Sequence, residues 1–301
     1  MIIPEYLNKG DTILIIATAR KISREEIDPV ITALESWGLR VVQGPNLLGC
    51  CNQYSGSDAE RAADLQWALD HPTAKAIMNA RGGYGTMRII DDVDFSGFRR
   101  KPKWLVGYSD ITVLHSHLNT LGICSIHGTM PVNLLKDEAS ALSVRDLLFG
   151  KNIAYEIPQH PLNRNGNASG HMAGGNLSIL YALSGSISEM DYKGKILFIE
   201  DLDEYLYHID RMMLQLKRSG KLKDLAGLVV GGMTEMRDNL IPFGKQAEEI
   251  IAETVASYNY PVCFDFPAGH TLRNLAFYNG RGVSLSVTDS GSQIKYLPDE
   301  N

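Results

Sequence analysis

The sequence predicts an α/β protein with a parallel sheet, helices on both faces of that sheet, and a second α/β domain. Apolar runs of strand length alternate with amphipathic helical segments through the first half of the chain. A stretch rich in Pro, Asn and Gly, without apolar periodicity, interrupts this pattern near residue 160, and strand and helix patterns then resume. Strands that alternate with helices are typical of βαβ units and a parallel sheet.

The elements of the first half follow from apolar spacing and capping signals. The continuous apolar run at 11–17 is typical of a buried parallel strand. Ser23 and Glu26 have the spacing of a capping box, so a helix begins there, and Gly38 is a natural stop. A second helix is expected from a cap at Ser57 or Asp58. The same reasoning predicts strands at 39–44, 74–80 and 103–108 and helices at 57–70 and 110–121.

The second half begins after "PQHPLNRNGNASG" (158–170), which we interpret as a loop or linker. Beyond it the patterns predict strands at 194–201 and 225–233, helices at 203–220 and 244–257, and a terminal hairpin at 283–297. The expected organisation is an N-terminal domain over 1–155, a linker over 156–170 and a smaller C-terminal domain over 171–301.

Composition narrows the class of protein. The chain has 301 residues, of which 44% are hydrophobic and 21% charged, close to an average soluble protein. The net charge is −6 and no basic stripe stands out, so neither nucleic acid nor an anionic membrane surface is an expected partner. The first apolar run is short and follows polar residues, unlike a signal peptide, which predicts a cytoplasmic protein.

Cysteine and histidine spacing gives no sign of a metal site. Cys50, Cys51, Cys124 and Cys263 match no zinc pattern and are expected to be reduced. In "HSH" (115–117) the two imidazoles are two positions apart, so on a helix they point in different directions. We therefore expect no metal.

Candidate chemistry lies where predicted strands end, because ligands bind at the carboxyl ends of strands in open α/β sheets. In "GYSD" (107–110), Ser109 sits at a strand-to-helix turn that resembles an incomplete nucleophile elbow. The alternative is that Ser109 or Asp110 only caps the helix. The glycine-rich turn "RGGYG" (81–85) either is a flexible connection or brings backbone N–H groups to an anion.

A nucleophilic serine needs a base, and the base needs an acceptor that orients it. His127, His208 and His270 are the candidate bases; His127 is expected to line the same cleft, whereas His208 lies on an amphipathic helix as a surface or packing residue. Glu200 ends an apolar strand, and a carboxylate buried there needs a partner, which a histidine would provide.

The ordered set of motifs resembles the LD-carboxypeptidase family of serine peptidases. "RGGYG", "GYSDIT", "HG", "GGNL", "ILFIED" and "GH" followed by an asparagine occur here in the family's order, and "GDTILIIA" and "SDAERAADL" fit as well. The resemblance spans essentially the whole chain. It implies a flavodoxin-like N-terminal domain, a smaller C-terminal α/β domain, a site between them, no cofactor and a homodimer.

The resemblance also implies site residues. Its catalytic serine, glutamate and histidine match Ser109, Glu200 and His270, and the oxyanion donors would be the backbone N–H groups of Gly83 and Asp110. Two departures, "IIATAR" after the first strand and "NLAFYNG" after the histidine, would alter the rim of the cleft. Substrate contacts are expected from residues beside the motif loops: Arg81 and Arg273 as anchors of a terminal carboxylate, with Tyr84 and Tyr108.

Three functions remain open from the sequence. The first is a metal-independent carboxypeptidase that releases the terminal D-Ala of a cytosolic murein tetrapeptide during peptidoglycan recycling. The second, from the same family, is a microcin C immunity peptidase that cleaves an aminoacyl-adenylate-like conjugate and would need an aromatic platform for adenine. The third is a non-catalytic binding module in which Ser109 is only a cap.

Overall fold

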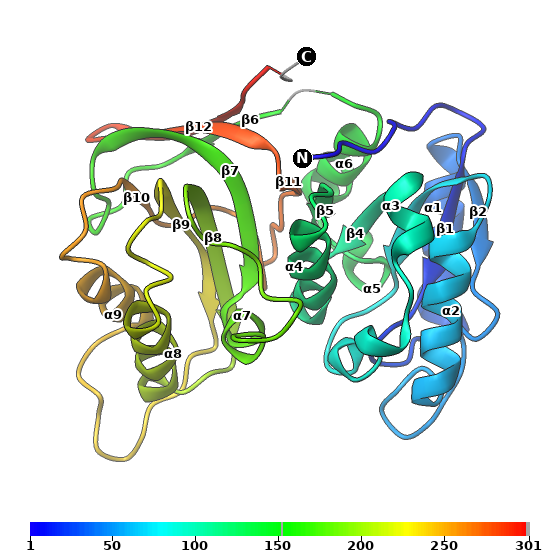
Figure 1. The fold of residues 1–301 in the computed structure, drawn as a ribbon, viewed down its shortest axis with the longest axis horizontal. Coiled ribbons are helices and arrows are strands. Elements are labelled where there is room, and N and C mark those ends of the chain that lie inside the picture. Colours follow the sequence, from blue (N-terminus) through cyan, green and yellow to red (C-terminus); the bar gives the residue numbers. More distant parts are fainter. Residues whose placement is uncertain (152, 299–301) are drawn as a thin grey trace.

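The computed structural model describes residues 1–151 and 153–298, which form two sheets lying side by side with helices around them (Figure 1). The first sheet has six strands in the order β11-β5-β4-β3-β1-β2, and the second has seven in the order β10-β9-β8-β7-β12-β13-β6. The predicted α/β class is confirmed. The last residues of the predicted C-terminal domain, 299–301, lie outside the described residues.

The first sheet has the doubly wound order 2-1-3-4-5 of flavodoxin-like folds. Its five parallel strands are β1 (Thr12–Ile16), β2 (Arg40–Gln43), β3 (Ala74–Asn79), β4 (Trp104–Gly107) and β5 (Ser125–His127). Strand β11 (Phe277–Asn279) comes from the far end of the chain and adds antiparallel to β5.

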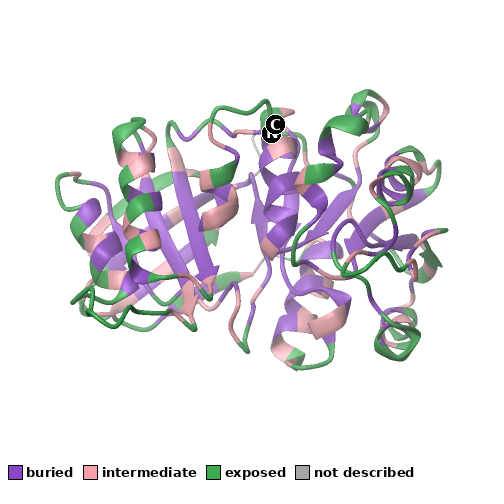
Figure 2. Cartoon of the chain, turned by 90° about the horizontal axis from the view of Figure 1, so that it is seen from below, coloured by how far each residue is buried: buried purple, intermediate pink, exposed green. Residues whose placement is uncertain are grey.

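Side-chain alternation explains why helices cover both faces of this sheet. Ile13 and Ile15 of β1 point into one hydrophobic core and Leu14 and Ile16 into the other, and all four are fully buried. The first core is closed by α1 (Arg24–Ser36), α5 (Pro131–Leu134) and α6 (Glu138–Leu148). The second is closed by α2 (Asp58–Asp70), α3 (Ser96–Arg100) and α4 (Thr112–Thr120). Figure 2 shows the strands buried between these layers.

Two of the predicted helix starts are confirmed in detail. Ser23 accepts a hydrogen bond from Glu26 N–H, and the Glu26 side chain accepts from Ser23 N–H, which completes a capping box. Ser57 rather than Asp58 caps α2, with Glu60 as its reciprocal partner. The helix expected at 110–121 opens instead with a 3₁₀ turn, η3 (Ser109–Ile111), before α4. Two further 3₁₀ turns, η1 (Thr86–Arg88) and η2 (Ile90–Asp92), follow β3.

The second sheet is mixed. Strands β7 (Gly166–Asn176), β8 (Lys195–Leu202), β9 (Gly227–Thr234) and β10 (Val262–Cys263) run parallel. Strands β6 (Ala154–Ile157), β12 (Gly282–Thr288) and β13 (Gly291–Tyr296) are antiparallel, and β12 and β13 form the predicted terminal hairpin. Helices α7 (Leu177–Ala182), α8 (Leu206–Arg218) and α9 (Ala247–Thr254) pack on one face.

Two features of this sheet differ from the sequence prediction. Residues 166–170, interpreted as loop, form the start of β7, because this polar segment pairs with β12, which lies more than a hundred positions away. Strand β6 spans the boundary predicted at residue 155 and belongs to the second sheet, whereas β11, within the predicted C-terminal domain, belongs to the first. The chain therefore crosses between the two sheets after residue 151 and twice more near its end.

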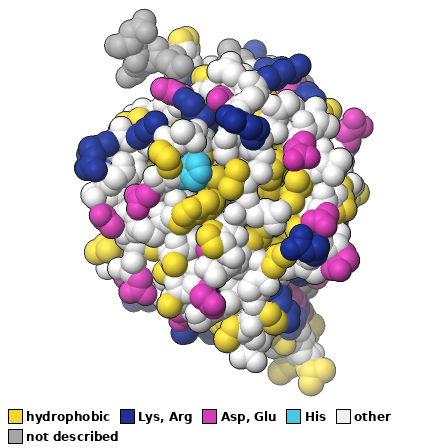
Figure 3. All heavy atoms as spheres, turned by 90° about the vertical axis from the view of Figure 1, so that its right-hand side faces the viewer, with side chains coloured by type: hydrophobic (Ala, Val, Ile, Leu, Met, Phe, Trp, Pro, Cys, Tyr) yellow, Lys and Arg dark blue, Asp and Glu magenta, His cyan; other side chains and the backbone are white. Residues whose placement is uncertain are grey.

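The exposed face of the N-terminal half carries charges of both signs. Figure 3 shows Lys and Arg interspersed with Asp and Glu on the face of the N-terminal half, with hydrophobic side chains between them. In the part of the chain that the structure describes, no helix combines the length and the apolar character that crossing a bilayer requires.

Candidate active site

Ser109 lies on a sharp turn at the carboxyl end of β4. Its φ is 64°, a left-handed conformation that costs a residue with a Cβ about 1–2 kcal/mol. Gly107 makes the turn compact, since a Cβ there would lie 2.9 Å from the Ile111 side chain. Neither η3 nor α4 has a side-chain cap, so the interpretation of Ser109 or Asp110 as a cap of this helix is wrong. The turn instead presents the Ser109 hydroxyl beyond the sheet edge.

The glycine-rich turn after β3 packs directly against this serine. A Cβ on Gly82 would lie 3.0 Å from Ser109 Cβ and 3.2 Å from Ser109 Oγ, so a side chain there would crowd the serine. The buried Asp110 carboxylate joins the two turns by accepting a hydrogen bond of 2.9 Å from Thr86 N–H. Burial raises the pKa of Asp110. The hydrogen bond from Thr86 N–H attaches the end of the glycine-rich turn to the turn that carries Ser109.

A buried arginine that the sequence analysis did not single out also holds the glycine-rich turn. Arg61, within the "SDAERAADL" segment, is 1% exposed and donates hydrogen bonds to the carbonyl oxygens of Thr18 and Gly85. It thereby ties the turn after β1 to the turn after β3. An arginine among the apolar positions of a predicted helix was the available signal, because a buried guanidinium needs several acceptors.

The second half of the chain brings a histidine and a carboxylate to Ser109. His270 Nε2 lies 3.0 Å from Ser109 Oγ, and His270 Nδ1 lies 2.7 Å from Glu200 Oε2. Glu200 lies on β8 and is fully buried, whereas His270 follows β10 and its side chain is 15% exposed. The His270 backbone N–H also donates to Glu200 Oε2, at 3.2 Å. The three candidates form one continuous hydrogen-bonded chain.

The electrostatic surroundings favour a protonated His270. Burial alone would lower the pKa of this imidazole, but the charge and hydrogen bond of Glu200, helped by Asp201 and Glu235, raise its pKa above the ordinary value. An imidazolium that forms next to Ser109 is therefore stabilised by the carboxylate behind it. This is the behaviour required of a base that takes a proton during a reaction.

Gly269 lets the histidine loop approach the glutamate. Its φ is 102°, and a Cβ there would lie 2.7 Å from both Cβ and Cγ of Glu200. Gly269 N–H donates to Asn274 Oδ1 at 2.9 Å, which closes the loop. The asparagine of the "GH" motif thus shapes the loop that carries the imidazole.

We expect Gly269→Ala to lower at least tenfold the kcat of a reaction that uses Ser109 and His270, because the new methyl group displaces Glu200 from His270. The strained alanine should also destabilise the fold by about 1–3 kcal/mol. Gly185→Ala is the matched control, since Gly185 also has a positive φ of 81° but a Cβ there would meet no heavy atom of the described residues within 4 Å, apart from its chain neighbours. The control should lose stability with kcat unchanged. Steady-state kinetics and thermal unfolding of both variants test this, and equal kcat values would contradict it.

Asp201 is a site residue that the sequence analysis missed. It is 2% exposed and lines the cavity beside Ser109. It accepts hydrogen bonds from Asn176 Nδ2 at 2.9 Å and Ser178 N–H at 2.8 Å. Burial and the neighbouring Glu200 raise the pKa of Asp201 to about 7. The register of β8 against β9 shifts at this point, as is common beside active sites.

The two halves of the molecule meet at a glycine pair. A Cβ on Gly175 would lie 2.4 Å from Thr112 Oγ1, so β7 can touch α4 only without a side chain there. Thr112 Oγ1 also accepts a hydrogen bond of 3.0 Å from Asn176 N–H. The "GGNL" motif therefore docks the strand next to β8 onto the helix that follows Ser109, and this sets the distance between the serine and its partners.

A cavity of about 700 Å³ lies beside Ser109 and is lined by residues from both halves of the chain. Of the predicted site residues, Gly83, Tyr108, Ser109, Asp110, Arg81 and His270 line it. Glu200 lies behind His270. Tyr84 and Arg273 are not among the lining residues: Tyr84 is 45% exposed and packs against the Tyr54 ring, and the Arg273 side chain is 64% exposed, 4.0 Å from Asp137. Their placement beside the motif loops in sequence does not bring them into the cavity.

His127 does not line the cleft, which corrects the sequence expectation. It is fully buried, stacks on the Phe277 ring at 4.8 Å, and neither ring nitrogen has a hydrogen-bond partner among the described residues. Burial lowers its pKa well below the ordinary value. It is a neutral packing residue at the junction of β5 and β11. His208 of α8 pairs with Glu204 at 2.5 Å, as expected of a helix-surface residue.

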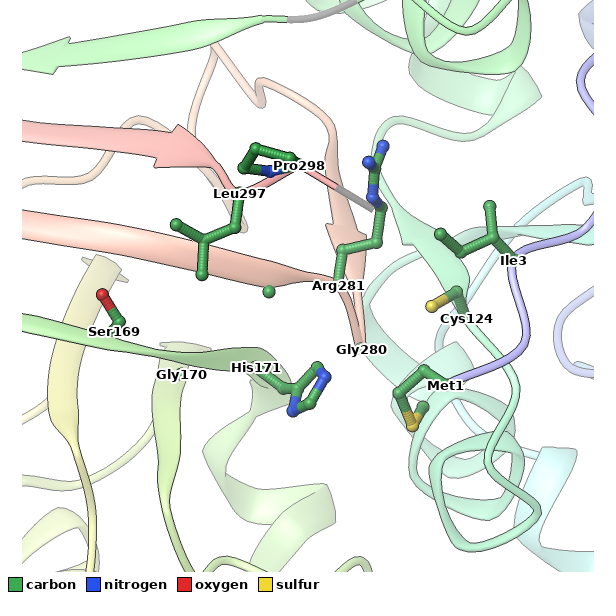
Figure 4. Close-up of a pocket in the computed structure, with 11 residues that line it drawn as sticks. Met1, Ile3, Cys124, Ser169, Gly170, His171, Gly280, Arg281, Leu297 and Pro298 are labelled. Atoms are coloured by element: carbon green, nitrogen blue, oxygen red, sulfur yellow. The ribbon is translucent and has the colours of Figure 1, made fainter. Parts of the chain in front are cut away.

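A second cavity, of about 380 Å³, lies on another side of the domain junction (Figure 4). Met1, Ile3 and Cys124 line it from the N-terminal half, together with His171 of β7 and with Arg281 from the segment between β11 and β12. None of Ser109, Glu200 and His270 contributes to its lining. The chemistry therefore belongs to the larger cavity. In the described part of the chain, no group of three or more His, Cys, Asp or Glu side chains could hold a metal ion.

A serine, a histidine and a glutamate that are joined by hydrogen bonds within a two-domain α/β fold define a serine hydrolase. Comparison with known proteins makes the class more specific. Two family models match the chain. The "LD-carboxypeptidase N-terminal domain" matches residues 13–128, and the "LD-carboxypeptidase C-terminal domain" matches residues 169–285. The chain belongs to the LD-carboxypeptidase family and is a serine-type carboxypeptidase.

Individual relatives span nearly the whole chain. A protein named "Probable murein peptide carboxypeptidase" from Bacillus subtilis is 36% identical, over 97% of this chain and 94% of its own length. The crystal structure of muramoyltetrapeptide carboxypeptidase from Oxalobacter formigenes has a TM-score of 0.87 at 26% identity, over 96% of this chain and all of that one. The microcin C7 self immunity protein MccF, in complex with aspartyl sulfamoyl adenosine, has a TM-score of 0.87 at 19% identity, over 99% of each chain, and shares the fold.

Proposed function

We propose that this enzyme releases the terminal D-alanine from murein tetrapeptides, with Ser109 as nucleophile, His270 as general base and acid, and Glu200 as the group that orients the imidazole. The observation that carries the proposal is the pair of contacts of 3.0 Å from Ser109 Oγ to His270 Nε2 and 2.7 Å from His270 Nδ1 to Glu200 Oε2. The names of the Bacillus subtilis and Oxalobacter formigenes relatives support the choice of substrate.

The geometry supports the following sequence of steps. Ser109 Oγ attacks the carbonyl carbon before D-alanine while His270 Nε2 takes the hydroxyl proton. His270 then gives this proton to the leaving amine, and an acyl ester remains on Ser109. Water attacks the ester with His270 again as base, which releases the shortened peptide. Throughout, Glu200 holds Nδ1–H and keeps Nε2 directed at the serine.

The oxyanion would be bound by backbone N–H groups of Gly83 and Asp110. Both residues line the cavity, and the turn containing Gly83 packs against Ser109 through Gly82. Each donor of this kind is worth about 3–4 kcal/mol of transition-state stabilisation. The strained Ser109 turn and the Asp110 side chain, bound to Thr86 N–H, fix the position of both donors before substrate arrives.

A second candidate reaction is cleavage of an aminoacyl sulfamoyl-adenosine conjugate, the ligand named for MccF. Adenine recognition needs an accessible aromatic face. Among the described residues that line the cavity, Tyr108 is the only aromatic side chain apart from His270, and it is 6% exposed. Its ring packs on His270 at 5.0 Å and its hydroxyl accepts from Asn133 Nδ2. Tyr108 therefore supports the imidazole rather than a nucleobase, which favours the tetrapeptide.

The test is release of D-alanine from purified L-Ala-γ-D-Glu-diamino acid-D-Ala in the presence of EDTA, with aspartyl sulfamoyl-adenosine assayed in parallel. We expect turnover of the tetrapeptide at unchanged rate with the chelator. Cleavage of the adenosine conjugate alone would replace the proposed substrate with the second candidate. Turnover of neither would contradict both.

The family resemblance further suggests that the enzyme is a homodimer that acts in the cytoplasm on peptides recovered from the cell wall. Light scattering after size-exclusion chromatography measures the mass in solution, and a value near 33.2 kDa would contradict the dimer. Activity in the soluble cytoplasmic fraction, rather than in the periplasmic or membrane fraction, tests the location.

A further inference from the structure

Arg20 occupies a place in the cavity that the sequence analysis left unassigned. It ends "IIATAR", the segment after β1 that departs from the turn expected of the family. Arg20 N–H donates to Gly82 O at 3.3 Å, so its backbone is attached to the glycine-rich turn. The residue is exposed and lines the cavity together with Gly83 and Ser109.

The side chain of Arg20 lies across Gly83. A Cβ on Gly83 would lie 2.5 Å from Arg20 Cδ and 2.8 Å from Arg20 Nε, and the Gly83 φ of 109° also favours glycine. The Arg20 side chain therefore lies beside the turn that we assign to the oxyanion. Within residues 1–151 and 153–298, it makes no ion pair, so its donors are available to a ligand.

The other cations near the site are less suited to bind a carboxylate there. Arg81 is already paired with Glu26 at 3.3 Å, and the exposed Arg273 side chain does not line the cavity. Lys136 lines the cavity and makes no ion pair among the described residues, but an ammonium cannot bind a carboxylate with two parallel hydrogen bonds as a guanidinium can. Arg20 combines free donors, planar geometry and a position beside Ser109.

We propose that the Arg20 guanidinium binds the terminal carboxylate of the substrate and so restricts the enzyme to the last peptide bond. The inference rests on the proposed function and adds the residue that selects the chain end. In a peptide, the terminal carboxylate carbon lies roughly 3–4 Å from the carbonyl carbon that is attacked. A carboxylate anchor must therefore lie close to the oxyanion turn, and Arg20 does.

The test compares the tetrapeptide with its C-terminal amide, which lacks the carboxylate charge. We expect Arg20→Ala to lower kcat/KM for the acid about 100-fold and for the amide less than threefold, as expected when a charge-assisted hydrogen-bond pair is lost. Arg20→Lys should recover part of the loss. Arg273→Ala is the matched control and should keep the wild-type preference for the acid.

Two results would overturn the inference. One is an equal loss for acid and amide in Arg20→Ala, or no loss for either. The other is a selective loss for the acid in Lys136→Ala but not in Arg20→Ala, which would assign the anchor to Lys136.

Binding separates this inference from the proposed function. Calorimetry in a Ser109→Ala background compares both peptides with and without Arg20→Ala. If the wild type releases no D-alanine, the proposed reaction fails, but selective weakening of acid binding by Arg20→Ala would still support the anchor. Equal affinities of the acid for Ser109→Ala and Ser109→Ala/Arg20→Ala would contradict the anchor, whether or not D-alanine is released.

Discussion

Ser109→Ala is expected to lower kcat for D-alanine release by about four to six orders of magnitude, because it removes the nucleophile and leaves only binding and oxyanion stabilisation. Ser109→Gly should be equally inactive. The two variants should differ in stability, since residue 109 has a φ of 64° and alanine carries the steric penalty that glycine avoids. We expect the glycine variant to be more stable than the alanine variant by about 1 kcal/mol.

This pair of variants separates chemistry from folding. If inactivity came from a damaged fold, the more stable glycine variant would recover activity. Measured kcat and denaturant unfolding of both proteins give the answer. Residual activity within about tenfold of wild type in either variant would show that Ser109 is not the nucleophile.

Glu200→Gln is expected to lower kcat about 10⁴-fold, because the amide no longer holds His270 in the tautomer that directs Nε2 at Ser109. The pH dependence should also move. His270 acts as a base only when neutral, so activity rises with pH through its pKa, which lies above the ordinary value because of Glu200. Without that charge burial dominates, and the rising limb shifts to lower pH.

The same substitution should change stability in a pH-dependent way. A histidine whose folded pKa is raised contributes stability that is fully present below its unfolded pKa, near 6.5, and is lost as pH rises through the folded pKa. The free energy of unfolding that Glu200→Gln loses relative to wild type should therefore be larger at about pH 5.5 than at about pH 8.5.

Glu235→Gln is the matched control for this prediction. Glu235 is exposed, and its charge is the weakest of the influences that raise the pKa of His270. We expect little change in kcat and a small shift of the profile in the same direction. pH–rate profiles and an NMR titration of the His270 ring measure both variants. A rising limb that stays in place in Glu200→Gln would contradict the assigned role of the carboxylate.

Local pattern was sufficient for most elements of the first sheet. Apolar runs and capping residues such as Ser23 and Glu26 act over a few positions, and burial on alternating faces of β1 leaves a direct mark in the sequence. The start of β7 at Gly166 had no such mark, because polar residues there form a strand only by pairing with β12. Likewise β11 joins the first sheet through pairing with β5, which no local signal indicates.

The sequence by itself determined the class of protein, the turn that bears Ser109 and, through the order of motifs, its proposed partners. Only the tertiary structure brought His270 to Ser109 across 161 positions, buried His127 away from the cleft, and placed Asp201 and Arg20 in it. The physical reason is the distance along the chain over which each effect acts. Propensity, capping and periodicity act over neighbouring residues, whereas the docking of β7 on α4 through Gly175 and Thr112 depends on how two folded halves pack.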